Sequence, residues 1–164
     1  MLQNEDTFHF KGRNRRPPMD PLNAALSFVY TLLCHDCAAA RRGVGLDPQM
    51  GVLHQPRSGR DSLALDLMEE FRCLWGDRFV LTLVNGRKLL PSHFDVQAGG
   101  AVFLSAEGRK VVLGAWQERK REVVEHPYLH EKLPRGLLPY VQALLLSKTL
   151  RGDLSEYPPY LWKY

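Results

Sequence analysis

The most constraining feature of the sequence is a long apolar segment with helical periodicity close to its beginning. Asp20 is a favourable helix N-cap and Pro21 suits the first helical position. From Leu22 to about Ala40, apolar residues recur every three or four positions and cover most sides of the predicted helix. Such a helix must be surrounded by other elements, so the pattern predicts the buried central helix of a globular domain.

Further helices are predicted along the rest of the chain from the same periodicity. They cover, approximately, residues 62–74, 78–84, 115–124 and 136–150. Residues 78–84 contain Val, Thr and Phe, which favour a strand locally, but their helical neighbours favour a helix. The sequence Trp75-Gly76-Asp77 is interpreted as a break between the first two of these helices.

One β-hairpin and an extended tail complete the predicted fold. Residues 101–104 and 110–113 are rich in valine and leucine, and a glycine lies between them, which is typical of a hairpin. The prolines in residues 157–162 exclude a helix there, so this tail is expected to pack as an extended cover. The predicted fold class is mainly α: one compact multi-helix domain over residues 1–164, with residues 1–20 as an extended basic arm.

Composition limits the location and excludes several classes of protein. A chain of 164 residues with 45% hydrophobic content can bury a real core. No apolar run reaches the roughly 20 residues that cross a bilayer, and the acidic first residues do not fit a secretory signal. We therefore expect a cytoplasmic protein with no membrane partner. Cys34 and Cys37 form a C-x-x-C sequence without a second ligand pair at zinc spacing, so we interpret them as small buried hydrophobes.

The basic residues are clustered although the formal net charge is only +4. Three groups stand out: Lys11, Arg13, Arg15 and Arg16; Arg57 and Arg60; and Arg119, Lys120 and Arg121. Each group alone is most often a solvated surface. Together they would suit a polyanion whose phosphates are spread over a broad face.

A candidate metal site lies on the second predicted helix and the loop before it. Asp66 and Glu69 are three residues apart and so share one helix face, about one turn from each other. Ser62 shares this face, and His54 lies on the preceding loop, from which it could reach the same face. An imidazole with two carboxylates is a suitable ligand set for Mg²⁺ or Mn²⁺.

Residue spacing alone also allows a simpler interpretation of this site. Two acids on a helix exterior are usually solvated, and a single histidine is usually structural. The apolar residues on both sides of Asp66 favour the metal site, because an unpaired carboxylate in such a segment is costly. Elsewhere, His126 and His130 are interpreted as structural because Pro127 disrupts any helix that would align them.

Several long motifs resemble those of the CRISPR-associated adaptation endonuclease/integrase family, the universal spacer-acquisition enzyme. They are residues 15–30 (RRPPMDPLNAALSFVY), 45–48 (GLDP), 51–54 (GVLH), 62–72 (SLALDLMEEFR), Gly99-Gly100, His126-Pro127 and Tyr157-Pro158-Pro159. The resemblance extends over roughly residues 8–164. It implies the family's C-terminal helical domain, and its N-terminal β-sandwich domain is expected to be absent from this chain.

The resemblance also implies which residues form the catalytic metal site. The family holds a divalent ion, Mg²⁺ or Mn²⁺, through a glutamate, a histidine and an aspartate. The histidine matches His54, the aspartate matches Asp66, and an often acidic position one turn on matches Glu69. The glutamate lies on a helix upstream of the basic arm, and we expect this chain to begin after that helix. Asn23 and Ser62 are expected to orient the ligands, and a helix cap is an equal alternative for Ser62.

The implied function is a metal-dependent DNA endonuclease, or integrase, that inserts short DNA into the repeat array in prokaryotic antiviral defence. Phosphate contacts are expected from Arg13, Arg15, Arg16, Arg57 and Arg60. The expected partners are DNA, a second copy in a homodimer and a small second adaptation subunit.

Two other functions remain open from the sequence. One is a non-catalytic DNA-binding or assembly module derived from that enzyme, which would agree with the lack of a match for the family's glutamate. It predicts DNA binding that depends on neither a metal ion nor Asp66. An unrelated metal-dependent hydrolase predicts turnover of a small ester without salt-dependent DNA affinity.

Overall fold

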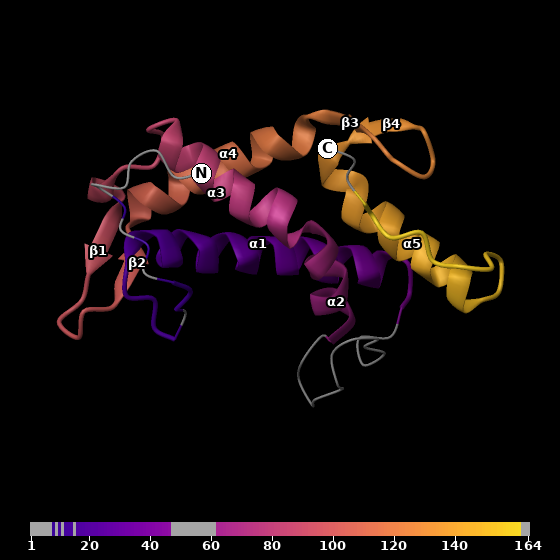
Figure 1. The fold of residues 1–164 in the computed structure, drawn as a ribbon, viewed down its shortest axis with the longest axis horizontal. Helices are drawn as coiled ribbons and strands as arrows, with labels where there is room; N and C mark the ends of the chain where they lie inside the picture. Colours follow the sequence, from indigo (N-terminus) through magenta and orange to yellow (C-terminus); the bar gives the residue numbers. More distant parts are fainter. Residues whose placement is uncertain (1–7, 9, 11, 15, 47–61, 162–164) are drawn as a thin grey trace. The chain divides into compact units, whose positions relative to one another are not determined.

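The computed structural model describes residues 8, 10, 12–14, 16–46 and 62–161. This part of the chain is mainly α (Figure 1), which confirms the predicted fold class. The α-helices are α1 (Pro21–Gly43), α2 (Ser62–Phe71), α3 (Arg78–Asn85), α4 (Ala106–Arg121) and α5 (Leu138–Leu150). A π-helical turn (Arg72–Asp77) and two 3₁₀ turns (Pro91–His93 and Arg135–Leu137) join them. None of the described helices is both long enough and apolar enough to cross a membrane.

In the part of the chain that the structure describes, the strands form two short antiparallel pairs. β1 (Phe94–Val96) pairs with β2 (Val102–Leu104), with Asp95 opposite Phe103. β3 (Val123–Glu125) pairs with β4 (Lys132–Pro134), with Val124 opposite Leu133. The second pair was not predicted from the sequence.

The predicted partner of β2 is wrong. Residues 110–113 belong to α4, which begins at Ala106 rather than near residue 115. Gly108 explains the change of structure, because a Cβ on this glycine would lie 2.4 Å from the backbone oxygen of His93. The glycine therefore permits close contact between α4 and the preceding segment, and it does not form the turn that the sequence suggested.

The chain forms two compact units whose boundaries fall inside helical segments. Unit 1 contains Met1–Leu32 and Cys73–Gln117, and unit 2 contains Leu33–Arg72 and Glu118–Tyr164. One boundary crosses α1, another crosses α4, and the third lies in the π-helical turn. The expectation of a single domain over residues 1–164 stays a prediction.

Aromatic packing dominates the core of unit 1. The ring of Trp116 lies 5.2 Å from that of Trp75 and 5.1 Å from that of Phe79, measured between ring centroids. Phe8, from the arm, contacts Phe94 of β1 edge-on at 6.0 Å. Large buried rings contribute most to such a core because each removes a wide apolar surface from water.

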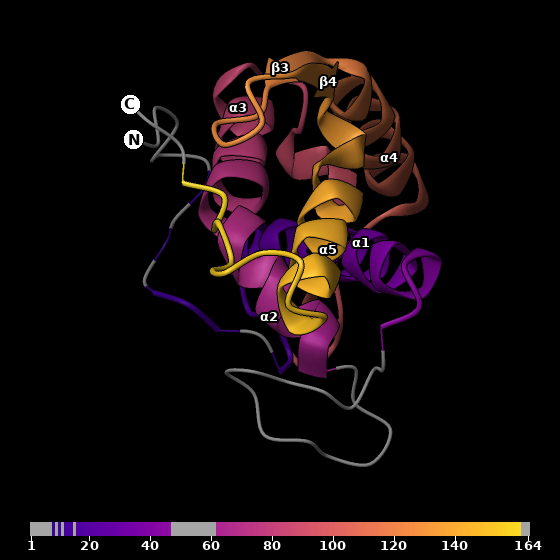
Figure 2. The ribbon, with the colours of Figure 1, turned by 90° about the vertical axis from the view of Figure 1, so that its right-hand side faces the viewer.

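Unit 2 packs α2 against α5 and the C-terminal tail. Leu63, Leu67 and Phe71 form the buried stripe of α2, as predicted. The ring of Phe71 lies 5.3 Å from that of Tyr160, which is 4% exposed. Figure 2 shows the tail turning back after the end of α5 and passing beside α2. The described tail has no helix or strand, in agreement with its prolines.

The predicted break at residues 75–77 is also wrong. α2, the π-helical turn and α3 follow one another without interruption (Figure 1). Gly76 is needed for contact rather than for chain reversal, because a Cβ there would lie 2.7 Å from Cε1 of Tyr30. Along this continuous helical segment, the buried residues recur every four positions. In a regular α-helix, residues four apart are rotated by about 40° around the helix axis, so the buried face would gradually turn away from the core. A π-helical turn has more residues per turn, and it therefore reduces this rotation.

Candidate functional site

α2 places Asp66 and Glu69 one turn apart in two different environments. Asp66 is only 9% exposed, and Ser62, one turn before it, is fully buried. Glu69 is more accessible: its side chain is 35% exposed and its Oε2 lies 2.9 Å from Nη1 of Arg72. The apolar residues of α2 turn its buried face inward, and Asp66 is carried with them. A carboxylate so enclosed must be compensated by partners or by a cation.

Four of the predicted site residues lie outside the described part of the chain: His54, Arg57, Arg60 and Arg15. The described residues contain no group of three or more His, Cys, Asp or Glu side chains that could hold a metal ion. The structure therefore places two of the three candidate ligands, and the joint arrangement with His54 stays a prediction.

Asn23 organises the N-terminal arm. It is fully buried, and its Nδ2 donates to the backbone oxygen of Gly12 (2.9 Å) and to Oδ2 of Asp20 (2.7 Å). Its Oδ1 accepts from Nη1 of Arg13 (2.6 Å) and from the backbone nitrogen of Asn14 (3.1 Å). Both amide hydrogens are thus engaged within unit 1. The predicted role of Asn23 beside the metal ligands stays untested.

Arg13 is exposed but is held by contacts within unit 1. Besides Asn23, its guanidinium donates to Oγ of Ser27 at 3.2 Å and lies 5.2 Å from the ring centroid of Tyr30. Tyr30 in turn donates its hydroxyl hydrogen to Oδ1 of Asp77. Arg16 is exposed on the same arm. The arm is therefore anchored through Asn23 and Arg13, and Arg16 is more available to an outside ligand.

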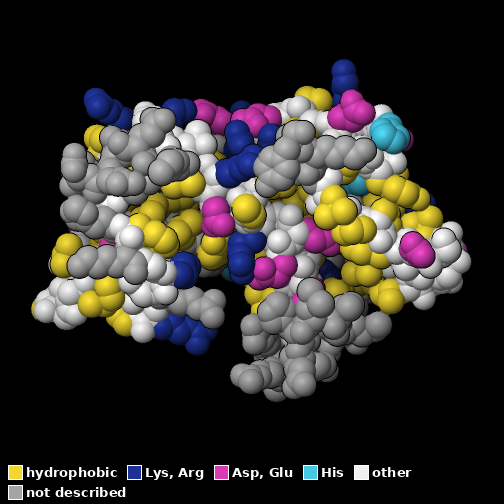
Figure 3. Space-filling model, in the orientation of Figure 1, with side chains coloured by type: hydrophobic (Ala, Val, Ile, Leu, Met, Phe, Trp, Pro, Cys, Tyr) yellow, Lys and Arg dark blue, Asp and Glu magenta, His cyan; other side chains and the backbone are white. Residues whose placement is uncertain are grey.

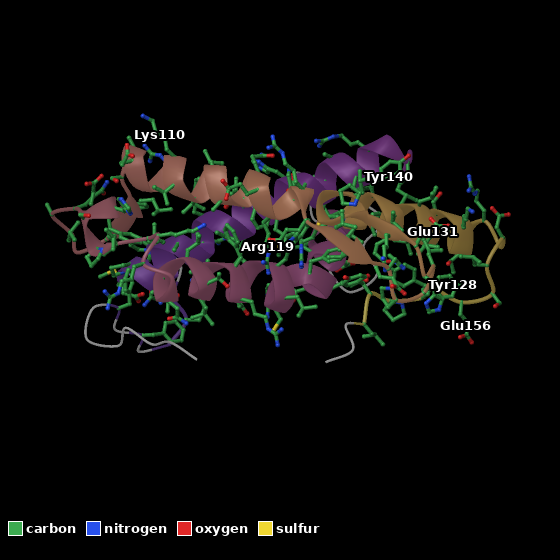
Figure 4. All side chains as sticks on the ribbon, turned by 90° about the horizontal axis from the view of Figure 1, so that it is seen from above. Lys110, Arg119, Tyr128, Glu131, Tyr140 and Glu156 are labelled. Atoms are coloured by element: carbon green, nitrogen blue, oxygen red, sulfur yellow. The ribbon has the colours of Figure 1, made fainter. Side chains whose placement is uncertain are left out.

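The third basic group is partly balanced by acids. Nζ of Lys120 lies 3.0 Å from Oδ1 of Asp36, and Nη1 of Arg119 lies 3.2 Å from Oε1 of Glu122. Figure 3 shows Lys and Arg side chains beside Asp and Glu side chains on the face drawn. Figure 4 labels Arg119. It also labels Tyr140 on α5, and Tyr128 and Glu131 in the loop between β3 and β4. Paired charges attract phosphates less strongly, so this group is a weaker nucleic-acid candidate than the arm.

A hydrogen-bonded cluster around Glu70 was not predicted from the sequence. Glu70 follows Glu69 on α2, and its Oε2 accepts from Nε2 of Gln142 and from the backbone nitrogen of Tyr160, both at 2.8 Å. Its Oε1 accepts from the hydroxyl of Tyr157. We call Glu70, Gln142, Tyr157 and Tyr160 the Glu70 cluster. Burial raises the pKa of Tyr157 far above its usual value, and the charge of Glu70 raises it further.

The Glu70 cluster continues to the β3–β4 hairpin through His126, which is fully buried. Nε2 of His126 lies 2.9 Å from Oε1 of Gln142. Nδ1 of His126 accepts from the backbone nitrogens of Tyr128 (3.3 Å) and Leu129 (3.2 Å). His126 is therefore structural, as predicted, while His130 is exposed in the same loop. The signal in the sequence was Gln142, the polar residue in the otherwise apolar run of residues 141–146 on α5.

Comparison with known proteins identifies the family. Residues 1–118 match the family model described as CRISPR associated protein Cas1. A Rhodospirillum rubrum protein named CRISPR-associated endonuclease Cas1 2 is 58% identical over 95% of this chain. The chain belongs to the Cas1 family.

Other Cas1 relatives match over nearly the whole chain. The Cas1 endonuclease of Leptospira interrogans is 47% identical over 99% of this chain and 64% of its own length. The Rhodospirillum protein is covered over 45% of its length. The chain thus spans about half to two thirds of these curated relatives.

Solved structures, some of them of Cas1 proteins, share the fold of this chain. A Cas1 protein from Thermotoga maritima superposes with a TM-score of 0.75 at 31% identity, over 87% of this chain and 44% of that one. A casposase bound to its integration product gives a TM-score of 0.84 at 21% identity, over 96% and 47%. A Cas6-RT-Cas1–Cas2 complex gives 0.78 at 27% identity, over 95% and 17%. The helical Cas1 architecture is therefore present in this chain.

Proposed function

We propose that this chain is the helical part of a metal-dependent DNA endonuclease and integrase that acts in CRISPR spacer acquisition. The observation that carries the proposal is Asp66, a buried carboxylate on α2 one turn from Glu69, in a chain of the Cas1 family. Its relatives from Rhodospirillum and Leptospira are named CRISPR-associated endonucleases, which supports a nuclease. The casposase of similar fold, solved with an integration product, supports strand joining.

The residues of α2 fit a hard divalent cation. Asp66 and Glu69 offer carboxylate oxygens on one face, which Mg²⁺ and Mn²⁺ prefer, and His54 would add an imidazole. When bound, the ion would stabilise negative charge on the target phosphate and favour deprotonation of the attacking hydroxyl. Glu69 would have to leave its ion pair with Arg72 to bind the ion directly. A further ligand would come from outside the described residues or from another chain.

Phosphate binding is proposed for the basic arm and the loop before α2. Arg16 is exposed, whereas Arg13 is engaged with Asn23, Ser27 and Tyr30. Arg13 would therefore hold the arm in place, and Arg16 would contact phosphate together with Arg15, Arg57 and Arg60. Each such contact releases counterions, so DNA affinity should fall steeply with salt. Cas2 is proposed as a partner because the Cas1 chain of similar fold was solved in a complex with Cas2. A homodimer is proposed as well.

The test is strand joining and cleavage of a branched DNA substrate with Mn²⁺ or with EDTA. His54→Ala and Asp66→Ala are compared with Asp153→Asn, which neutralises an exposed acid of unit 2 that contacts Arg151. Circular dichroism establishes that each variant is folded. We expect metal-dependent turnover that both site variants lose and the control retains.

Two results would contradict this function. Salt-dependent DNA binding without turnover, unaffected by Asp66→Ala, would favour the non-catalytic DNA-binding module. Turnover of a small phosphoester without DNA affinity would favour an unrelated hydrolase.

A further inference from the structure

Among the described residues, Glu70 is held by three donors from two distant parts of unit 2. One donor, Nε2 of Gln142, comes from α5, and the other two, the hydroxyl of Tyr157 and the backbone nitrogen of Tyr160, come from the tail. We propose that Glu70 is a positioning residue: its cluster fastens the tail and α5 to α2 and thereby fixes the helix that carries Asp66. This inference rests on the proposed metal-binding role of Asp66.

The donors and the acceptor in the Glu70 cluster match one another. A carboxylate accepts only, and all three groups around Glu70 donate to it. Hydrogen bonds to an ionised acceptor are stronger than neutral ones, and they are stronger again where little water competes. Tyr157 also accepts from Nε2 of Gln142 at 2.8 Å, which closes the cluster on itself. Glu70 thus joins α2, α5 and the tail through one charged group.

The cluster acts on the part of α2 that bears the candidate ligands. Asp66 and Glu70 are four residues apart on one helix, so their side chains lie on the same face, one above the other. Phe71, the next residue, packs its ring against Tyr160 at 5.3 Å between centroids. Polar and apolar contacts therefore secure the same turn of α2. Loss of the polar contacts should let this turn move and displace the carboxylate of Asp66.

His126 holds the Gln142 side chain of the cluster in place. His126 lies 2.9 Å from Oε1 of Gln142, which leaves the amide nitrogen of Gln142 directed at Glu70, Tyr157 and the backbone oxygen of Pro158. The glutamine therefore has little freedom to flip its amide group. A glutamine fixed in this way holds the Glu70 carboxylate in one defined position.

Tyr157→Phe is the sharpest variant because it removes one hydroxyl and leaves every charge in place. Tyr140→Phe is the matched control: it removes a hydroxyl from an exposed tyrosine on α5 of the same unit. Lys120→Met is a second control, which weakens unit 2 through the Asp36 ion pair without touching the cluster. Circular dichroism verifies folding, and all measurements are made well below the unfolding midpoint of every variant.

Two readouts are measured on the folded chain. Hydrogen exchange reports the opening of the amides of residues 66–71, and Mn²⁺ titration followed by electron paramagnetic resonance reports metal affinity. For Tyr157→Phe we expect faster exchange confined to this turn, and a loss of Mn²⁺ affinity of about tenfold, as when a residue supporting a metal ligand is removed. Neither control should change these two quantities together.

Glu70→Gln separates hydrogen bonding from charge. Its amide oxygen can still accept from Gln142 and Tyr160, and its amide group can donate to the oxygen of the Tyr157 hydroxyl once that hydroxyl turns its hydrogen away from position 70. Glu70→Gln should therefore retain most Mn²⁺ affinity, while Glu70→Ala and the double variant Glu70→Gln/Tyr157→Phe should lose it. If Glu70→Gln weakens binding as much as Glu70→Ala does, Glu70 acts through its charge and the positioning role is wrong.

The remaining outcomes are also decisive. Unchanged exchange and unchanged Mn²⁺ affinity in Tyr157→Phe would overturn the proposal, as would equal effects in Lys120→Met. If the parent chain binds no Mn²⁺ at a site sensitive to Asp66→Ala, the proposed metal function fails, and the positioning role falls with it. The exchange of residues 66–71 still shows in that case whether the cluster fastens α2.

Discussion

His126 and Gln142 are joined by a buried contact of 2.9 Å between Nε2 of the imidazole and Oε1 of the amide, and this contact defines the tautomer of the histidine. The amide nitrogen of Gln142 donates to other groups, so its oxygen must accept from His126. Nδ1 of His126 accepts from two backbone nitrogens and so carries no hydrogen. Of the two ring nitrogens of His126, Nε2 is therefore the one that donates.

The tautomer of His126 is directly measurable. In a long-range ¹H–¹⁵N spectrum at neutral pH, Nε2 should show the shift of a protonated nitrogen and Nδ1 that of an acceptor. Exposed His130, whose Nδ1 lies 3.7 Å from Oε1 of Glu125, supplies a second histidine signal for comparison. A hydrogen on Nδ1 of His126 would contradict the network, since two backbone donors would then face a third.

Two tail tyrosines should respond in opposite ways to loss of their hydroxyls. The Tyr157 hydroxyl contacts Glu70 and Gln142, so Tyr157→Phe should lower the free energy of unfolding by about 1–3 kcal/mol. The buried Tyr160 hydroxyl has no hydrogen-bond partner within the part of the chain that the structure describes. Tyr160→Phe should therefore leave stability unchanged or raise it by up to about 1 kcal/mol. Urea unfolding of both variants tests this, and equal losses would contradict it.

Alkaline pH should destabilise the fold through Tyr157. Burial, and then the charge of Glu70, raise the pKa of Tyr157 in the folded chain. The stabilising contribution of the neutral phenol is complete below the unfolded-state pKa of about 10 and is lost as pH rises toward the folded-state pKa. The unfolded chain binds fewer protons in this window, so the free energy of unfolding should fall with pH.

Tyr157→Phe supplies the control for this pH dependence. Urea unfolding between about pH 9 and pH 11 should show a steep decline for the parent chain and a shallower one for the variant. Some decline should persist, because burial also raises the pKa of Tyr160. Identical slopes in the two proteins would mean that Tyr157 does not cause the effect.

Two helical glycines should respond oppositely to alanine. A Cβ at Gly76 would lie 2.7 Å from the ring of Tyr30, which is held by Arg13 and Asp77, so Gly76→Ala should cost about 1–3 kcal/mol of stability. A Cβ at Gly114 would have nothing within 4 Å, so Gly114→Ala in α4 should add up to about 1 kcal/mol. Thermal unfolding of the two variants measures the contrast. A tolerated Gly76→Ala would mean that Tyr30 can move aside.

The sequence predicted those elements whose signals are local. The cap before α1 is confirmed, because Oδ1 of Asp20 accepts from the backbone nitrogen of Asn23 at 2.8 Å. The helical choice for α3 and the span of α5 are confirmed as well. Gly76 and Gly108 misled the prediction, since both were interpreted as chain-breaking positions. Each is required by a neighbour distant in sequence, Tyr30 or His93, which local pattern does not reveal.

The site was predictable only in part for the same reason. Spacing placed Asp66 and Glu69 on one helix face, and the structure has them on α2. It did not single out Glu70, whose partners Gln142 and Tyr157 lie 72 and 87 residues away. In sequence, Glu69 and Glu70 are equivalent neighbours. In the structure one forms an ion pair near the surface and the other is the acceptor of a partly buried cluster.

The boundaries between the two units lie within α1, the π-helical turn and α4. This placement limits where the chain can be cut, either in a truncation experiment or by gene rearrangement. Each boundary cuts a run of backbone hydrogen bonds instead of a loop, so a fragment ending there would have a frayed helix end with unsatisfied backbone groups. Each unit is also assembled from two separate stretches of chain. Gene fusion or recombination at a single point could therefore not transfer either unit intact, and the two would be inherited together.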